Sequence, residues 1–146
     1  MKRDVKVQWF YPHPPEVIWE CLTNQELLNK WTFIKDFKPV VGHEFEAHAK
    51  PRKSQGFDGI MYHKVLEVIP LKKLSYTFRG GPQKGVITLD TIVTWTLTPK
   101  NGGTELKVEQ SGFEGTKNYF TSFIMELGWK KILSKKITKA LQTLDA

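Results

Sequence analysis

Residues 91–113 read TIVTWTLTPKNGGTELKVEQSGF, and this stretch decides the fold class. Before the turn, apolar residues and one threonine recur at every second position, which indicates a strand with one buried face. These residues are Ile87, Leu89, Thr91, Val93, Trp95 and Leu97. Between the two halves, Asn101-Gly102 supplies the positive φ that a two-residue hairpin turn needs. The stretch therefore predicts two long antiparallel strands joined by a tight turn.

Further strands are expected on the N-terminal side of this hairpin. Apolar and polar residues alternate over residues 5–10, 44–49 and 73–78, and residues 57–69 form a longer strand-like run. Turn residues separate these runs, among them Gly80-Gly81-Pro82. Consecutive strands joined by short turns form an antiparallel meander. We therefore expect a sheet that is antiparallel throughout.

Two short helices are expected after the first strand. Pro14 and Pro15 favour a helix over residues 16–22, because proline is tolerated in a first helical turn. Thr23 is followed three residues later by Glu26, which is typical of a capping box at the start of a second helix. The sequence thus predicts a helix pair between the first strand and the rest of the sheet.

From about residue 118 to 144 the apolar period becomes that of a helix. The first apolar set is Phe120, Phe123, Ile124 and Leu127, and the second begins at Trp129, rotated by roughly 140° around the helix. We expect a helix that bends near Gly128 or is buried on different sides along its length.

The lengths of these elements predict a cavity. A helix of about 27 residues spans ~40 Å, and a ten-residue strand spans ~33 Å. One helix can therefore lie along a strongly curved sheet, but a straight rod cannot contact a curved surface everywhere. The predicted fold is α+β, with a curved antiparallel sheet wrapped around a long C-terminal helix and an apolar cavity between them.

Composition limits the classes of partner. The 146 residues predict one domain over residues 1–146. Lys plus Arg outnumber Asp plus Glu by 22 to 15, but the basic residues are spread along the chain, which argues against a nucleic-acid site. No apolar run approaches the ~18 residues of a membrane span, and no signal-peptide pattern is visible. The single cysteine, Cys21, cannot form an internal disulfide, so we expect a cytoplasmic protein.

The sequence offers few reactive groups. No histidine pair has metal-ligand spacing with a carboxylate, and no nucleophile elbow or phosphate loop is present, so we expect neither a metal nor a cofactor. Cys21 is expected to be a small buried apolar residue. His63 can point inward from its strand. The carboxylates that could approach the cavity mouth as an acid or base are Asp58, Glu109, Glu114 and Glu126, of which Glu109 alternates with inward residues.

Aromatic residues are the main candidates for the cavity wall. The residues that we expect to line it are Trp31, Phe33, Phe37, Phe45, Met61, His63, Tyr76, Phe78, Trp95, Gln110, Phe120, Phe123 and Leu127. Large rings supply apolar area, while Gln110, Tyr62 or Tyr76 could orient a ligand by hydrogen bonds. Residues 51–56 and 112–118 are rich in glycine and charge and are expected to border the entrance.

Several blocks of the sequence resemble one protein family. The segments FYPHPPEVIWECLTNQELLNKW (10–31), VVGHEFEAHAKP (40–51), GFDGIMYHKVLEVIPLKKLSYTF (56–78), TIVTWTLTPKNGGTELKVEQSGF (91–113) and GWKKIL (128–133) carry the likeness. In this order they resemble the activator of heat-shock protein 90 ATPase homologue-like family of the START/SRPBCC superfamily, whose fold is the helix grip. One departure is Gln110, where many relatives carry histidine before Ser-Gly-Phe.

The resemblance implies a fold more than an activity. The superfamily includes lipid and hormone binders, polyketide cyclases and aromatases, and co-chaperone domains. Our leading expectation is that the cavity binds a small hydrophobic or amphipathic molecule. The alternatives are a cyclase- or dehydratase-type enzyme acting on an enolisable hydrophobic substrate, and a co-chaperone-like domain that binds a protein partner. The co-chaperone function is the least expected of the three, because the chain starts at the first strand of the expected domain.

Overall fold

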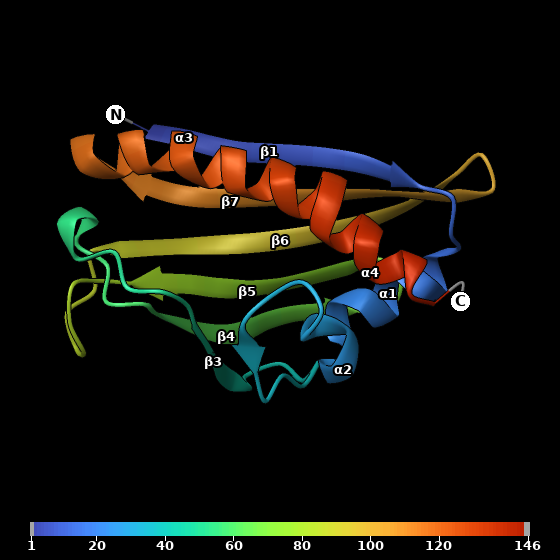
Figure 1. Cartoon of the computed structure of the whole chain (residues 1–146), viewed down its shortest axis with the longest axis horizontal. Helices are drawn as coiled ribbons and strands as arrows, with labels where there is room; N and C mark the ends of the chain where they lie inside the picture. The colour runs from blue at the N-terminus through green and yellow to red at the C-terminus, as the bar shows by residue number, and fades with distance from the viewer. Residues whose placement is uncertain (1, 145–146) are drawn as a thin grey trace.

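The computed structural model describes residues 2–144, which form one seven-stranded antiparallel sheet and a long C-terminal helical segment (Figure 1). The strands are β1 (Lys2–Tyr11), β2 (Ile34–Lys35), β3 (Glu44–His48), β4 (Ile60–Ile69), β5 (Lys73–Gly80), β6 (Leu89–Lys100) and β7 (Gly103–Glu114). Their order across the sheet is β1-β7-β6-β5-β4-β3-β2, so the first strand pairs with the last. The expected antiparallel, curved sheet is confirmed.

The β6–β7 hairpin forms as the sequence predicts. Asn101 and Gly102 have φ values of 48° and 78°, and the flanking residues Lys100 and Gly103 pair. Trp95 pairs with Val108 and is fully buried, as the alternation requires. Ile87 differs from the expectation, because it precedes β6 and is exposed.

The first two helices lie where the prolines place them, but their boundary differs from the prediction. The helices are α1 (Pro15–Thr23) and α2 (Gln25–Leu28). The predicted capping box at Thr23 is wrong, since the Thr23 hydroxyl donates to the Trp19 carbonyl 2.8 Å away in the last turn of α1. Asn24 caps α2 instead, and its Oδ1 accepts from the backbone N–H of Glu26 at 2.9 Å.

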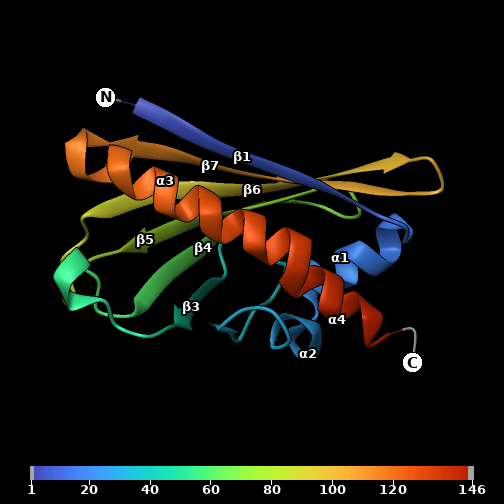
Figure 2. The ribbon, with the colours of Figure 1, turned by 45° about the horizontal axis from the view of Figure 1, so that its top comes forward.

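The C-terminal helical segment crosses the sheet diagonally (Figures 1 and 2). It consists of α3 (Gly115–Lys131), a π-helical stretch η2 (Ile132–Ile137) and α4 (Thr138–Gln142). In Figure 2 its first part lies beside β1 and β7, and its last part lies over α1 and α2. α3 continues without interruption past Gly128 to Lys131, and the helical hydrogen-bond pattern changes only from Ile132.

The core lies between the sheet, α1 and the last third of this helical segment. Leu133, Ile137 and Leu141 are buried there. The Tyr11 hydroxyl donates to the Leu133 carbonyl at 2.6 Å, which ties β1 to the π-helical turn. Apart from the sheet and these helices, a short 3₁₀ turn, η1 (Lys53–Gln55), lies in the β3–β4 connection. The N-terminal part of the helical segment, α3, extends beyond this core and covers a cavity.

Candidate functional site

A cavity of about 650 Å³ lies between α3 and the sheet. Its floor comes from β3, β4 and β5, and its roof from α3 and η2. The floor residues include Ala47, Met61, His63, Tyr76 and Phe78. The segments 31–34 and 52–57 form its sides, and Figure 2 shows the β3–β4 connection beside the first turns of α3. The volume is typical of sites for small molecules.

One strip of the helix faces this cavity. Lys117, Thr121, Ile124, Gly128, Ile132 and Lys136 line it. Their spacing of three or four residues places them in a row along a helix. Gly128 is in the middle of the row, and a Cβ built there would meet no atom within 4 Å. Gly128 is also exposed, so a side chain added here would find open space at the edge of the cavity.

Aromatic rings pack around His63 on the floor. The imidazole stacks on Phe45 with 4.8 Å between ring centroids, and the Tyr76 and Phe78 rings approach it edge-on. His63 Nδ1 lies 2.8 Å from the Thr77 carbonyl, which can only accept, so this nitrogen carries the hydrogen. Burial lowers the pKa of His63 to about 4 and keeps the ring neutral at pH 7. Among the described residues, His63 Nε2 is the only buried side-chain nitrogen or oxygen without a hydrogen-bond partner.

A hydrogen-bonded network fixes the wall from behind. Trp129 Nε1 donates to Gln110 Oε1 at 2.8 Å, and Gln110 Nε2 donates to Thr91 Oγ1 at 2.9 Å. Trp95 Nε1 donates to the Tyr76 hydroxyl at 2.9 Å, and burial raises the pKa of Tyr76 to about 12. These bonds hold the Trp129 indole and the Tyr76 ring in place. Both ends of the Gln110 amide are used by the protein itself.

The structure places part of the expected wall on the cavity and part elsewhere. The expected residues that line it are Trp31, Phe33, Met61, His63, Tyr76, Phe78 and Phe120. Those that lie behind the wall in the core are Phe37, Phe45, Trp95 and Gln110, because other rings and the Trp129 indole cover them.

Phe123 and Leu127 lie outside the cavity altogether. Leu127 is 67% exposed, and Phe123 packs under the Arg3 guanidinium, 3.9 Å from its ring centroid. The reason is the rotation of α3, which turns the small, fully buried Ser122 and the Trp129 indole toward the sheet. The apolar set that the helical period selected is therefore largely a solvent-facing one, with only Phe120 and Ile124 reaching the cavity mouth.

The candidate acid or base residues are also placed elsewhere. Asp58, Glu109, Glu114 and Glu126 do not line the cavity. Glu126 pairs with Arg3 at 2.6 Å, and this hydrogen bond lowers the pKa of its carboxyl. Cys21 is buried, and burial raises the pKa of its thiol to about 11, as expected of an inert residue. The wall that the described residues form contains no aspartate or glutamate.

Sequence reasoning missed several wall residues. They include Ile34, Ala47, Phe57, Leu89, Thr121, Met125, Gly128, Trp129 and Ile132. The sequence does carry one signal for them. From Lys117 to Lys136, wall residues recur every three or four positions, with Gly128 near the centre of the row. Residues 51–56 and 112–118 do contribute to the wall, through Arg52, Gln55, Gly56, Lys117 and Asn118.

Residues 2–144 contain neither a helix suited to span a membrane nor a cluster of metal-binding side chains. No helix in this range is long and apolar enough to span a membrane. Within the same range, no group of three or more His, Cys, Asp or Glu is placed to hold a metal ion.

Comparison with known proteins identifies relatives of the whole fold. The family described as Activator of Hsp90 ATPase homolog 1-like protein matches residues 12–142. No curated protein matches the chain. The structure of MLL2253 from Mesorhizobium loti is similar at 36% identity with a TM-score of 0.84, covering 99% of this chain and 100% of that one.

Two more distant solved structures share the fold alone. The Aha1 dimer of Colwellia psychrerythraea has 20% identity and a TM-score of 0.71, with 90% of each chain covered. DynU16, a protein in the dynemicin biosynthetic locus, has 22% identity and a TM-score of 0.73, covering 96% of this chain and 47% of that one. A helix-grip fold with a cavity under its helix is compatible with ligand binding.

Proposed function

This chain belongs to the Activator of Hsp90 ATPase homolog 1-like family, and we propose that it binds a small hydrophobic or amphipathic molecule in the cavity beneath α3. The observation that carries the proposal is the cavity of about 650 Å³ with a mainly apolar wall. Large apolar residues lie on both its floor and its roof, among them Phe78, Met61 and Ile124. Such a wall favours a ligand by removing apolar surface from water.

Burial of apolar surface is the main source of affinity for such a ligand. A ligand that buries about 300 Å² of its apolar surface gains about 7.5 kcal/mol at 25 cal/mol per Å². Loss of translational and rotational freedom opposes this gain by several kcal/mol. Micromolar affinity, about 8 kcal/mol, therefore requires that the ligand also bury the apolar surface of the wall, and the bonds that hold Trp129 and Tyr76 in place support such a close fit.

Ligand binding accounts for the wall better than acid–base catalysis does. A cyclase or dehydratase needs a proton acceptor or donor with a pKa near neutrality at the reacting atom. The described wall offers no carboxylate, and its imidazole, His63, has a pKa of about 4. His63 is therefore a weak base at pH 7, although its ring contributes shape to the floor.

The proposal is tested with a neutral apolar fluorophore, N-phenyl-1-naphthylamine. We expect saturable fluorescence enhancement with the wild-type protein. Gly128 lines the cavity and a Cβ there meets no atom, so Gly128→Leu should narrow the cavity and weaken binding at least tenfold. Gly128→Ala adds only a methyl group and should leave binding within about twofold. The proposal fails if the fluorophore does not bind, or if both variants bind it like the wild type.

A further inference from the structure

The charged residues on the cavity wall are all basic. Arg52, Lys117 and Lys136 line the cavity, whereas no aspartate or glutamate does so among the described residues. None of these three cations takes part in an ion pair within residues 2–144. Because these cations border an apolar cavity and are not used by a carboxylate, they are available to the polar group of a ligand bound there.

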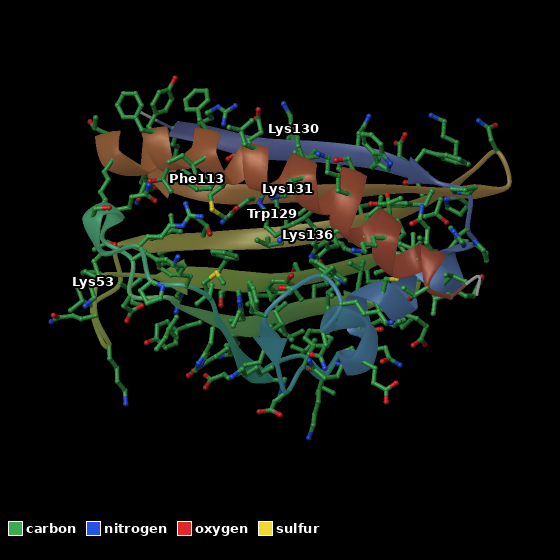
Figure 3. All side chains as sticks on the ribbon, in the orientation of Figure 1. Lys53, Phe113, Trp129, Lys130, Lys131 and Lys136 are labelled. Atoms are coloured by element: carbon green, nitrogen blue, oxygen red, sulfur yellow. The ribbon has the colours of Figure 1, made fainter. Side chains whose placement is uncertain are left out.

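Two of these cations lie at the same end of the cavity. Arg52 directly precedes η1, and Lys117 belongs to the first turn of α3. The Lys117 side chain reaches across to the η1 loop, since its Nζ would lie only 2.5 Å from a Cβ placed on Gly56. The ammonium therefore sits against the loop that carries Arg52. In Figure 3, Lys53 marks this loop beside the start of the helix.

The backbone holds this end in a defined shape. Arg52 and Phe57 exchange two hydrogen bonds, with N···O distances of 2.9 and 3.2 Å, and Gly56 closes the loop with φ of 69°. On the helix side, Asn118 Nδ2 donates to the Thr88 carbonyl at 2.8 Å. The loop that carries Arg52 and the helix that carries Lys117 are thus each anchored to the rest of the fold.

Lys136 does not belong to this cluster. It lies 19 residues beyond Lys117 on the helix, which corresponds to about 28 Å at 1.5 Å per residue. A small ligand cannot contact both lysines. The charge pattern therefore defines one doubly basic end, at Arg52 and Lys117, and an apolar interior that begins with Phe57, Met61 and Phe120.

From this arrangement we infer that the ligand is an amphipathic anion, whose acidic group binds between Arg52 and Lys117 while its apolar body lies under α3. The inference rests on the proposed function and specifies its ligand class. A guanidinium binds a carboxylate or a phosphate with two parallel hydrogen bonds, and an ammonium adds a further charged donor. The anion brings opposite charge to the end of the cavity that both basic residues line.

The test compares two probes with the same apolar chain, dodecanoate and dodecan-1-ol. Each displaces N-phenyl-1-naphthylamine from the protein at pH 8, below the micelle concentration of dodecanoate. We expect dodecanoate to displace the fluorophore at a concentration at least fivefold lower than dodecan-1-ol. In the double variant Arg52→Gln/Lys117→Gln this preference should disappear, while displacement by dodecan-1-ol stays within twofold of the wild type.

A second double variant controls for the net charge of the chain, which is +7. Lys6 and Lys72 are exposed and lie off the cavity wall, so Lys6→Gln/Lys72→Gln removes the same charge elsewhere. We expect this control to keep the preference for dodecanoate. Because Arg52 and Lys117 are also exposed, the test variant should retain the wild-type far-UV circular dichroism spectrum.

The outcomes separate the two proposals. Equal displacement by both probes in the wild type, or loss of the preference in the control variant as well, overturns the anion inference and leaves cavity binding standing. A preference that persists in Arg52→Gln/Lys117→Gln also overturns it. If the fluorophore does not bind, or neither probe displaces it, the proposed function itself fails.

Discussion

The two ends of the C-terminal helical segment show opposite relations to the sheet. Toward the C-terminus, Leu133, Ile137, Ala140 and Leu141 are all buried against the core. Toward the N-terminus, α3 buries only Ser122 before Trp129, and its large apolar residues are exposed or line the cavity. One continuous helical segment therefore closes the core at one end and roofs a cavity at the other (Figure 2).

The difference lies in how each end is attached. The C-terminal end is attached by apolar packing and by the Tyr11–Leu133 hydrogen bond. The N-terminal end is attached along its edges, where Arg3 donates to Ser122 Oγ at 3.2 Å and pairs with Glu126, and where Asn118 bonds to Thr88. Edge attachment supports a roof without filling the space beneath it. Stability and binding should therefore respond to different substitutions.

The largest expected contrast is between two leucines of the helical segment. Leu133→Ala should lower the free energy of unfolding by about 3 kcal/mol, because it removes buried methyl groups and leaves a void. Leu127→Ala, at an exposed position, should change it by less than about 0.5 kcal/mol. Urea unfolding followed by circular dichroism measures both. Similar losses for the two variants would contradict the division of the helix.

The next prediction concerns how the free energy of unfolding depends on pH through His63 on the cavity floor. Since burial lowers the pKa of His63 to about 4, the folded protein takes up its proton later than the unfolded chain, whose histidine titrates near 6.5. Stability should therefore fall as the pH drops from about 6.5 to about 4, by on the order of 3 kcal/mol from this residue. His63→Phe keeps a ring against Phe45 and should flatten this part of the profile.

Urea unfolding at pH 7.5 and 4.5 checks the acid prediction. The wild type and His63→Phe are compared directly, since the two proteins differ only at the buried imidazole. If His63→Phe and the wild type lose the same stability between these pH values, the buried imidazole is not the acid-sensitive group of the cavity floor.

A smaller loss of stability is expected at Gln110, whose partner Trp129 lies between the two ends of the helical segment. Gln110→Leu removes the acceptor of the Trp129 indole and the donor to Thr91. The buried indole N–H then lacks a partner, which should cost about 2 kcal/mol. The exposed Gln8→Leu serves as the matched change and should be nearly neutral. An unchanged midpoint for Gln110→Leu would show that water replaces the lost bonds.

The smallest effect is a gain. Gly128→Ala should stabilise the protein by about 0.5–1 kcal/mol, because glycine is a poor helix former and the added methyl group meets no neighbour. Thermal unfolding measures this shift. A destabilised Gly128→Ala would mean that the added methyl group does meet a neighbour, contrary to the structure.

Local rules predicted the sheet and the helices well. Alternation over residues 91–113 and the Asn101-Gly102 turn predicted the β6–β7 hairpin, and the length arithmetic predicted a helix lying over a curved sheet. The ordered blocks also pointed to the family that residues 12–142 match. These features depend on short-range periodicity, which a single sequence displays directly.

The site was harder to predict, because it depends on how the helix is rotated. Apolar periodicity assumes that large residues face inward, whereas α3 turns Ser122 inward and leaves Leu127 in water. A cavity removes the demand for large inward residues, so the rule fails where the cavity lies. Gln110 was misplaced for a different reason, since its partners Trp129 and Thr91 lie on other elements.

The central claim is that a small apolar molecule occupies the space beneath the roof. Intermolecular nuclear Overhauser effects test it most directly, with dodecanoate added to protein labelled with ¹³C at the methionine methyl groups and ¹⁵N at the indoles. Met61 and Met125 line the cavity, from floor and roof, whereas the exposed Trp9 lies on β1 away from it. The account predicts contacts from the alkyl chain to both methyl groups and none to the Trp9 indole. Contacts to Trp9, or none to either methionine, would contradict it.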